Sequence, residues 1–215
     1  MEWVNKLYSE TDKIWKENGK DKNGYSIFYS PVKSEPDILI IGYNPGGDES
    51  AFIESEIGVP KEHEYFSEKD GDYRLAKQMK KIFGNADMLD KLRQSVKFNL
   101  IFFRSKNIKE LSASKELINF CKNKTREIID KLQPKLILAE GFETYEELLK
   151  LTKGNKKTIY QNFPVKDDKQ KCISCIGETG DGIKIIGIIH PSGGHGISDE
   201  MLTQIGKNIK AELKD

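Results

Sequence analysis

The sequence has few cysteines and few histidines for its length. Its 215 residues include three cysteines, Cys121, Cys172 and Cys175, and three histidines. An odd number of cysteines in a domain of this size favours free thiols in the cytoplasm over a disulfide framework. Cys172 and Cys175 form a lone Cys-x-x-Cys pair, and adding Cys121 leaves a tetrahedral metal site one ligand short. We therefore expect no metal and no other cofactor.

Long apolar runs and an excess of either charge are also missing. No stretch approaches the eighteen or more apolar residues of a membrane span, and the first residues lack the basic head and apolar core of a secretory signal. Lysine and arginine number 35 against 34 acidic residues, a net charge of +1, which neither demands nor excludes a nucleic-acid partner. These absences predict a soluble, cytoplasmic protein, and we expect a monomer.

Short apolar runs bounded by turn residues are what the sequence does contain. Such runs are typical of strands buried on both faces of a sheet, and they occur at 38–42, 97–105, 134–141 and 183–189. Helical spacing of apolar residues lies between and around them, at 2–17, 73–83, 87–95, 112–133, 144–151 and 198–213, while 158–163 and 171–176 read as shorter strands. Strands that alternate with helices predict one domain over residues 1–215, a three-layer α/β/α sandwich with a mainly parallel central sheet.

Three of the buried strands end in unusual polar or glycine-rich segments. These segments are 42–47, Asn99 with Arg104-Ser105, and 190–196. Ligands bind outside the carboxyl ends of strands in open α/β sheets, so neighbouring strands would bring the three endings together into a small-ligand pocket. A nucleotide-phosphate hydrolase is a weaker interpretation, because segment 42–47 lacks the Lys-Ser/Thr of a P-loop and no Gly-x-Gly-x-x-Gly is present.

Together the endings resemble the uracil-DNA glycosylase superfamily over roughly residues 37–200. Gly42-Tyr-Asn-Pro-Gly46 is similar to the first motif of the mismatch-specific branch. The spacing from Asn99 to Arg104 is similar to that in the iron–sulfur branch, the strand 134–141 resembles one that usually reads Ala-Leu-Gly there, and His190-Pro-Ser192 resembles the late motif. The resemblance implies a uracil-DNA glycosylase-like fold. It also implies an enzyme that hydrolyses the N-glycosidic bond of uracil or a related damaged base in DNA.

The resemblance implies the catalytic roles of two residues. His190 would donate a hydrogen bond to the base oxygen as negative charge develops there, and Asn44 would orient a water toward the sugar carbon. The flipped base would hydrogen-bond to Asn99, whose amide offers one acceptor and two donors. The remaining expected contacts to base, sugar or phosphate are Gly42, Tyr43, Pro45, Gly46, Tyr65, Phe66, Arg104, Ser192 and His195, with Tyr65, Phe66 or Tyr43 stacking on the base.

The chain departs from the family in ways that keep a second hypothesis open. The cysteines that the iron–sulfur branch has near its N-terminus are absent, and segment 193–196 replaces the Pro-Leu pattern that forms an apolar wedge in other members. Asn44 stands where the most active branch has Asp, and an amide cannot act as a general base. Asn44 could instead cap its turn, and Arg104 could pair with a carboxylate. The alternative is therefore a non-catalytic module that binds a nucleobase or DNA on the same fold.

Overall fold

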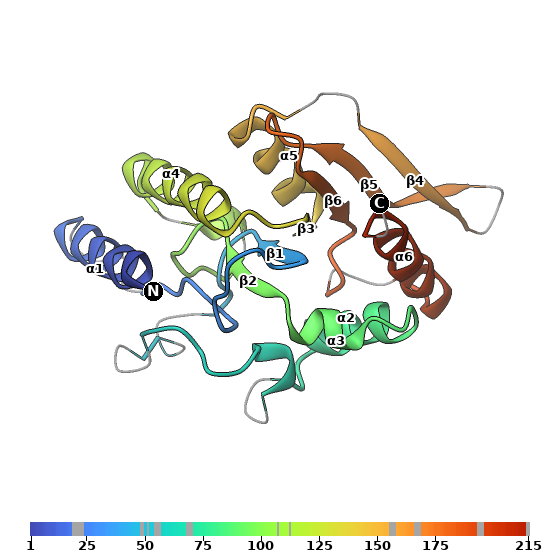
Figure 1. Ribbon diagram of the computed structural model, residues 1–215, viewed down its shortest axis with the longest axis horizontal. Helices are drawn as coiled ribbons and strands as arrows, with labels where there is room; N and C mark the ends of the chain where they lie inside the picture. The colour runs from blue at the N-terminus through green and yellow to red at the C-terminus, as the bar shows by residue number, and fades with distance from the viewer. Residues whose placement is uncertain are drawn as a thin grey trace.

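The computed structural model describes residues 1–18, 24–47, 50, 52–53, 57–67, 71–106, 108–111, 113–154, 158–165, 169–192 and 196–213. Within these residues six strands form one sheet in the order β2-β1-β3-β6-β5-β4 (Figure 1). The strands are β1 (Ile38–Gly42), β2 (Val96–Asn99), β3 (Leu136–Glu140), β4 (Ile159–Pro164), β5 (Gln170–Glu178) and β6 (Lys184–Ile188).

The sheet is mostly parallel. β1 pairs in parallel with β2 and with β3, and β3 pairs in parallel with β6. β5 and β4 extend the sheet as an antiparallel hairpin beyond β6. The sequence prediction of an α/β fold with a mainly parallel sheet is therefore confirmed. Four parallel neighbours place their carboxyl ends at one edge, where ligands bind in such folds.

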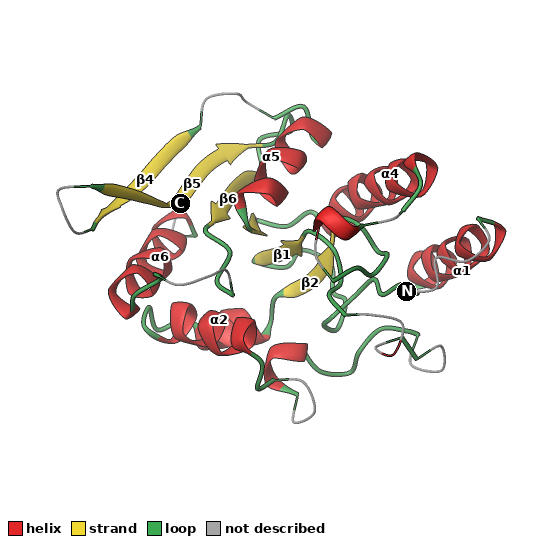
Figure 2. Ribbon diagram, turned by 180° about the vertical axis from the view of Figure 1, so that it is seen from behind, coloured by secondary structure: helices red, strands yellow, loops and turns green. Residues whose placement is uncertain are grey.

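Helices cover both faces of the sheet (Figures 1 and 2). One apolar core lies between the sheet and α1, α4 and α5, and the second lies between the sheet and α2, α3 and α6. The helices are α1 (Glu2–Glu17), α2 (Arg74–Gly84), α3 (Leu89–Arg93), α4 (Lys115–Leu132), α5 (Phe142–Leu151) and α6 (Asp199–Glu212), with 3-10 turns η3 (Glu64–Phe66) and η4 (Ile108–Glu110). None of the helices in the described ranges is long and apolar enough to cross a membrane.

The double cover explains the continuous apolar runs of the central strands. Ile38 and Ile40 of β1 belong to the core under α2 and α6, while Leu39 and Ile41 belong to the core under α1 and α4. All four side chains are fully buried. Because successive side chains point to opposite faces, a strand covered on both faces needs apolar residues at every position.

Two predicted elements differ from those observed. The strand expected over 97–105 leaves the sheet after Asn99. Residues 100–105 instead follow the loop after β1, with Leu100 N donating to Gly42 O and Ser105 N donating to Pro45 O. The helix expected from residue 112 begins at Lys115, because the Ser114 side chain accepts the Leu117 N–H and caps it.

Two further local features are an aromatic arm and the start of α6. The aromatic segment 25–32 lies as an extended arm, joined by isolated bridges from Tyr25 to Phe103 and from Phe28 to Phe98. Ser198 caps α6 by accepting a hydrogen bond from the Met201 N–H at 3.3 Å. The arm brings Tyr29 to the carboxyl edge of the sheet, where it matters for the site described next.

Candidate functional site

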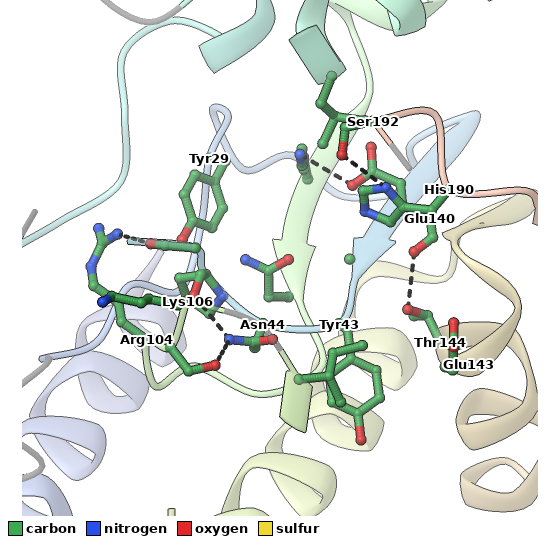
Figure 3. Close-up of a pocket in the computed structure, with 18 of the residues that line it drawn as sticks. Tyr29, Tyr43, Asn44, Arg104, Lys106, Glu140, Glu143, Thr144, His190 and Ser192 are labelled. Atoms are coloured by element: carbon green, nitrogen blue, oxygen red, sulfur yellow. Dashed lines mark hydrogen bonds and ion pairs between the residues drawn. The ribbon is translucent and has the colours of Figure 1, made fainter. Parts of the chain in front are cut away.

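A cleft of about 980 Å³ opens at the carboxyl edge of the parallel strands (Figure 3). Its walls come from the loops after β1 and β2, the start of α5, the segment after β6, and the region from η3 to α2. The structure brings most of the expected residues to this one cleft, namely Gly42, Tyr43, Asn44, Pro45, Gly46, Asn99, Arg104, His190 and Ser192. Segments that lie far apart in the chain thus meet at one place.

Strand alternation explains why polar groups gather on one face of the sheet at this edge. Lys97 pairs in register with Ile40, and Asn99 pairs with Gly42. Glu140 follows Leu138 by two residues on β3. Since side chains two apart share a face, Lys97, Asn99 and Glu140 point to the face that α2 and α6 cover. The apolar core on this face therefore ends in a polar floor.

The loop after β1 is held against the segment after β2. The Asn44 amide nitrogen donates to Pro45 O at 2.9 Å and to Ser105 Oγ at 2.8 Å. Both N–H donors of the Asn44 amide are therefore engaged within the protein. The Asn44 oxygen is the polar group of this side chain that remains to face a ligand.

Asn99 is enclosed but makes no hydrogen bond through its amide. Asn99 is 7% exposed, and its Oδ1 lies so close to Gly42 that a Cβ atom on Gly42 would collide with this oxygen. Among the residues that the structure describes, no side-chain hydrogen bond of Asn99 is found. Because Asn99 lines the cleft, its amide is available to a polar ligand that binds there.

His190 lies at the rim of the cleft beside Ser192. Ser192 Oγ and His190 Nδ1 are 3.0 Å apart (Figure 3). The pKa of His190 lies below its ordinary value of 6.5, first because the surrounding protein desolvates the charged ring; Glu140 opposes this shift, and the positive charge of Lys97 adds to it. His190 is therefore neutral at physiological pH, and a neutral imidazole has one N–H to donate.

The floor of the cleft holds a buried charge cluster that the sequence analysis missed. Lys97 Nζ lies 2.6 Å from Glu64 Oε1, 3.2 Å from Glu140 Oε2 and 2.5 Å from the Tyr65 hydroxyl. Tyr65 donates its hydroxyl proton to Glu140 Oε1, and Tyr73 donates to Glu64 Oε1 at 2.8 Å. Lys97 and Glu140 are 4% and 2% exposed, so the cluster is an enclosed ion-pair network.

The pKa values in the cluster follow from this enclosure. Burial by itself lowers the pKa of Lys97, but the carboxylates of Glu140 and Glu64 outweigh it, so the pKa lies above its ordinary value. The pKa of Tyr65 is raised by burial and then by the negative charge of Glu140. Lys97 is therefore a cation and Tyr65 a neutral phenol at physiological pH.

The structure does not place Tyr65 or Phe66 where a base could stack on them. Tyr65 is fully buried over Lys97, whose ammonium lies 4.2 Å from the centre of its ring, and Phe66 packs under the Arg93 guanidinium at 4.0 Å. Neither lines the cleft. The expectation fails because η3 turns both rings toward the protein interior.

Other aromatic rings do line the cleft. They are Tyr29, Tyr43 and Tyr73. The ring of Tyr43 points away from His190, whereas Tyr29 lies beside Arg104 on the opposite wall (Figure 3). The sequence carried little signal for Tyr29, because it sits in an arm far from every motif. A charged residue inside an apolar run, as at Lys97 and Glu140, was the signal that could have revealed the floor cluster.

Basic residues gather on the wall opposite His190. Arg104 donates from Nη1 to Gly46 O at 2.9 Å, while its buried Nε has no hydrogen-bond partner. Lys106 lies on the same side of the cleft (Figure 3), and Arg74 and Lys109 also line it. This position agrees with the prediction that Arg104 belongs to the site. The Arg104 side chain contacts a backbone carbonyl rather than a carboxylate.

His195 and the glycines before it lie outside the described residues, so the expected contact from His195 has no structural account. Of the three free cysteines, Cys121 and Cys175 are buried. Burial raises the pKa of each of these two thiols to about 12. Within the described part of the chain, no group of three His, Cys, Asp or Glu side chains could hold a metal ion.

Comparison with known proteins adds no relative. No protein-family model matches the chain, and no curated protein matches it significantly. Function must therefore be inferred from the geometry of the cleft.

Proposed function

We propose that this protein is a base-excision glycosylase that hydrolyses the N-glycosidic bond of a flipped base in DNA, of the uracil type or a related damaged base. One observation carries the proposal. Asn44, Asn99 and His190, which the resemblance to uracil-DNA glycosylases singles out, line one cleft although they come from three separate strands or loops. The unpartnered Asn99 amide inside that cleft supports a polar, base-like ligand.

The base would enter the cleft after leaving the DNA stack. Its hydrogen-bonding edge would meet Asn99 on the floor, where the absence of a side chain on Gly42 makes room for the Asn99 amide itself. Tyr29 would provide an aromatic contact, in place of the buried Tyr65 and Phe66. A planar ring with polar groups on its edge suits a cleft of this composition.

Bond cleavage would combine His190 and Asn44. The Ser192 hydroxyl would donate to His190 Nδ1, so that the ring keeps its proton on Nε2 and donates it toward the base oxygen. As the glycosidic bond breaks, the base takes the bonding electrons, and this hydrogen bond stabilises the negative charge. Asn44 Oδ1 would accept a hydrogen bond from the attacking water, whose oxygen adds to the sugar carbon while its proton passes to solvent. Asn44 takes up no proton, which makes the enzyme slow.

The basic wall would hold the DNA backbone. Arg104 and Lys106 lie on the side of the cleft away from His190 (Figure 3), and Lys109 and Arg74 also line the cleft. Lysine and arginine contacts to phosphates position a protein on DNA without reading its sequence. The Arg104 guanidinium is a charged donor group that a phosphate oxygen could accept from.

The experiment is to incubate the protein with single- and double-stranded oligonucleotides that carry one uracil or one oxidised pyrimidine, and to measure abasic sites. We expect slow release that falls at least about a hundredfold when His190→Ala and Asn44→Ala are combined. A control variant, Lys135→Ala, alters an exposed residue at the opposite end of β3 and should release bases normally. No release from any substrate, or release that the double variant leaves unchanged, would contradict the proposal.

The hydrogen bonds of Asn44 favour a second candidate. An amide that donates to Pro45 O and Ser105 Oγ is a good clamp for a turn, and this is all it would need to do in a non-catalytic module that binds a nucleobase. Binding of damaged DNA without any release of base would select this module over the enzyme.

A further inference from the structure

Two hydrogen-bond acceptors lie close together at Gly42 on the floor of the cleft. A Cβ atom built on Gly42 would collide with Asn99 Oδ1 and would lie 3.2 Å from Glu140 Oε2. The absence of a side chain on Gly42 therefore lets Asn99 and Glu140 approach each other, and both line the cleft. A ligand atom on this part of the floor meets the amide of Asn99 and the carboxylate of Glu140 at once.

Apart from the Asn99 amide, the donors near this part of the floor are already used. The three N–H donors of the Lys97 ammonium point to Glu64 Oε1, Glu140 Oε2 and the Tyr65 oxygen. The hydroxyl protons of Tyr65 and Tyr73 go to Glu140 and Glu64. Each oxygen of Glu140 thus accepts one hydrogen bond and keeps a further lone pair, whereas Lys97 and Tyr65 have no proton left for a ligand.

Glu140, rather than Asn99, decides what this part of the floor accepts. The Asn99 amide can present either its oxygen or its NH2 group, so it suits a carbonyl and an amino group equally. An ionised carboxylate only accepts hydrogen bonds. A carbonyl oxygen at position 4 of a pyrimidine placed against Glu140 would meet lone pairs with lone pairs, while an amino group at the same position would form a charge-assisted hydrogen bond.

We propose that Glu140 makes the cleft select a base that carries an exocyclic amino group, in preference to uracil. Cytosine-type bases offer their N4 amino group, and guanine-type bases offer adjacent N1–H and N2–H2 donors, which are the donors that carboxylate side chains accept. Uracil differs from cytosine by an oxygen at the same ring position. This inference rests on the proposed function for the reaction, but the donor and acceptor pattern of the floor supports it independently of catalysis.

Matched ligands that differ at one ring position test the inference. Deoxycytidine and deoxyuridine monophosphates are titrated into the 15N-labelled protein and their affinities are compared. In parallel, base release is measured from duplexes with one 5-hydroxycytosine or one 5-hydroxyuracil. We expect the amino-bearing partner to be favoured about tenfold in both assays, as a single well-placed hydrogen-bond contact discriminates between bases.

Glu140→Gln should remove or reverse this preference, because glutamine carries a donor as well as an acceptor. Glu143→Gln is the matched control, since Glu143 lines the same cleft but is not one of the side chains beside Gly42, and it should keep the wild-type ratio of the two affinities. The ratio of the two affinities, or of the two release rates, in the wild-type protein is a test by itself. If Glu140→Gln does not fold, a wild-type protein that binds or excises the uracil-type partner as well as the amino-bearing one overturns the inference.

The two assays separate the inference from the proposed function. If uracil-type bases are released as fast as amino-bearing bases or faster, and the two nucleotides bind equally well, the preference for an amino group is wrong. Base excision is still supported in that case. Tighter binding of the cytidine nucleotide without any base release supports the floor selectivity and contradicts base excision. No binding and no release would overturn both.

Discussion

Asn99 is a polar side chain that the fold encloses without giving it a hydrogen-bond partner in the described structure. Asn99 lines the cleft, so its amide is available to water or to a ligand rather than to other groups of the protein. Function and stability should therefore respond differently to a change at this one residue.

Asn99→Ala should leave the free energy of unfolding unchanged to within about 1 kcal/mol, or raise it, because no internal hydrogen bond is lost. The affinity for a nucleotide or damaged DNA should fall about tenfold or more. Urea denaturation and binding titrations measure the two effects. A large loss of stability together with unchanged affinity would show that Asn99 is a structural residue.

Lys97 shows the opposite behaviour, since all of its donors are used inside the protein. Lys97→Met should destabilise the protein by about 3 kcal/mol or more, because Glu64 and Glu140 would stay buried without their shared cation. Lys91→Met is the control, as it removes a half-exposed pair with Asp37 and should cost less than about 1 kcal/mol. Equal effects in denaturant unfolding would contradict the role of the buried cluster.

At the scale of elements, η3 connects stability to pH through His63. This residue precedes η3, is almost fully buried, and its Nδ1 accepts the Tyr65 N–H at 3.3 Å while its Nε2 lies 3.1 Å from Ser95 Oγ. Burial, with the charges of Lys97 and Arg93, lowers the pKa of His63 to about 3. The element that positions Glu64 and Tyr65 thus needs a neutral imidazole.

This shift predicts a loss of stability in acid. Between the ordinary pKa of 6.5 and the folded value of about 3, the unfolded chain binds a proton that the folded protein does not, so stability falls as the pH falls. The contribution of His63 from pH 7 to pH 5 should be about 2 kcal/mol. His63→Gln should flatten the pH dependence over this window, as measured by urea unfolding at each pH. An unchanged slope would mean that His63 has the same pKa in the folded and the unfolded chain.

At the scale of the whole molecule, the near-neutral net charge hides an uneven distribution. Arg104 and Lys106 lie on one wall of the cleft, while Glu140, Glu143 and His190 lie on the other (Figure 3). A DNA strand with its phosphates on the basic wall would bring a flipped base over the acidic floor. The net charge of +1 does not reveal this arrangement.

Lys106→Ala should therefore weaken DNA binding in low salt about equally for all sequences, and it should reduce the dependence of log affinity on log salt by about one. Lys135→Ala changes a lysine of the same charge that is paired with Asp37 at the other end of the sheet, and it should leave the salt slope unaltered. Fluorescence anisotropy across a salt series measures both slopes. Identical slopes for the two variants would remove the basic wall from the interface.

The apolar runs and their glycine-rich or polar endings were sufficient to predict the α/β fold, the mainly parallel sheet and three of the segments that line the cleft. These features are local, since a strand covered on both faces needs an unbroken apolar run and a ligand loop needs turn residues. Such a run has no period, however, so it does not reveal which face each side chain occupies.

Only the tertiary structure decided which polar groups the floor contains. The register of β1, β2 and β3 places Lys97, Asn99 and Glu140 on one face, and η3 then inserts Glu64 and Tyr65 against them from another part of the chain. The same packing removes Tyr65 and Phe66 from the cleft and brings Tyr29 to it. Contacts between residues 75 positions apart, as for Tyr65 and Glu140, depend on how the layers pack, and no local pattern in the sequence encodes them.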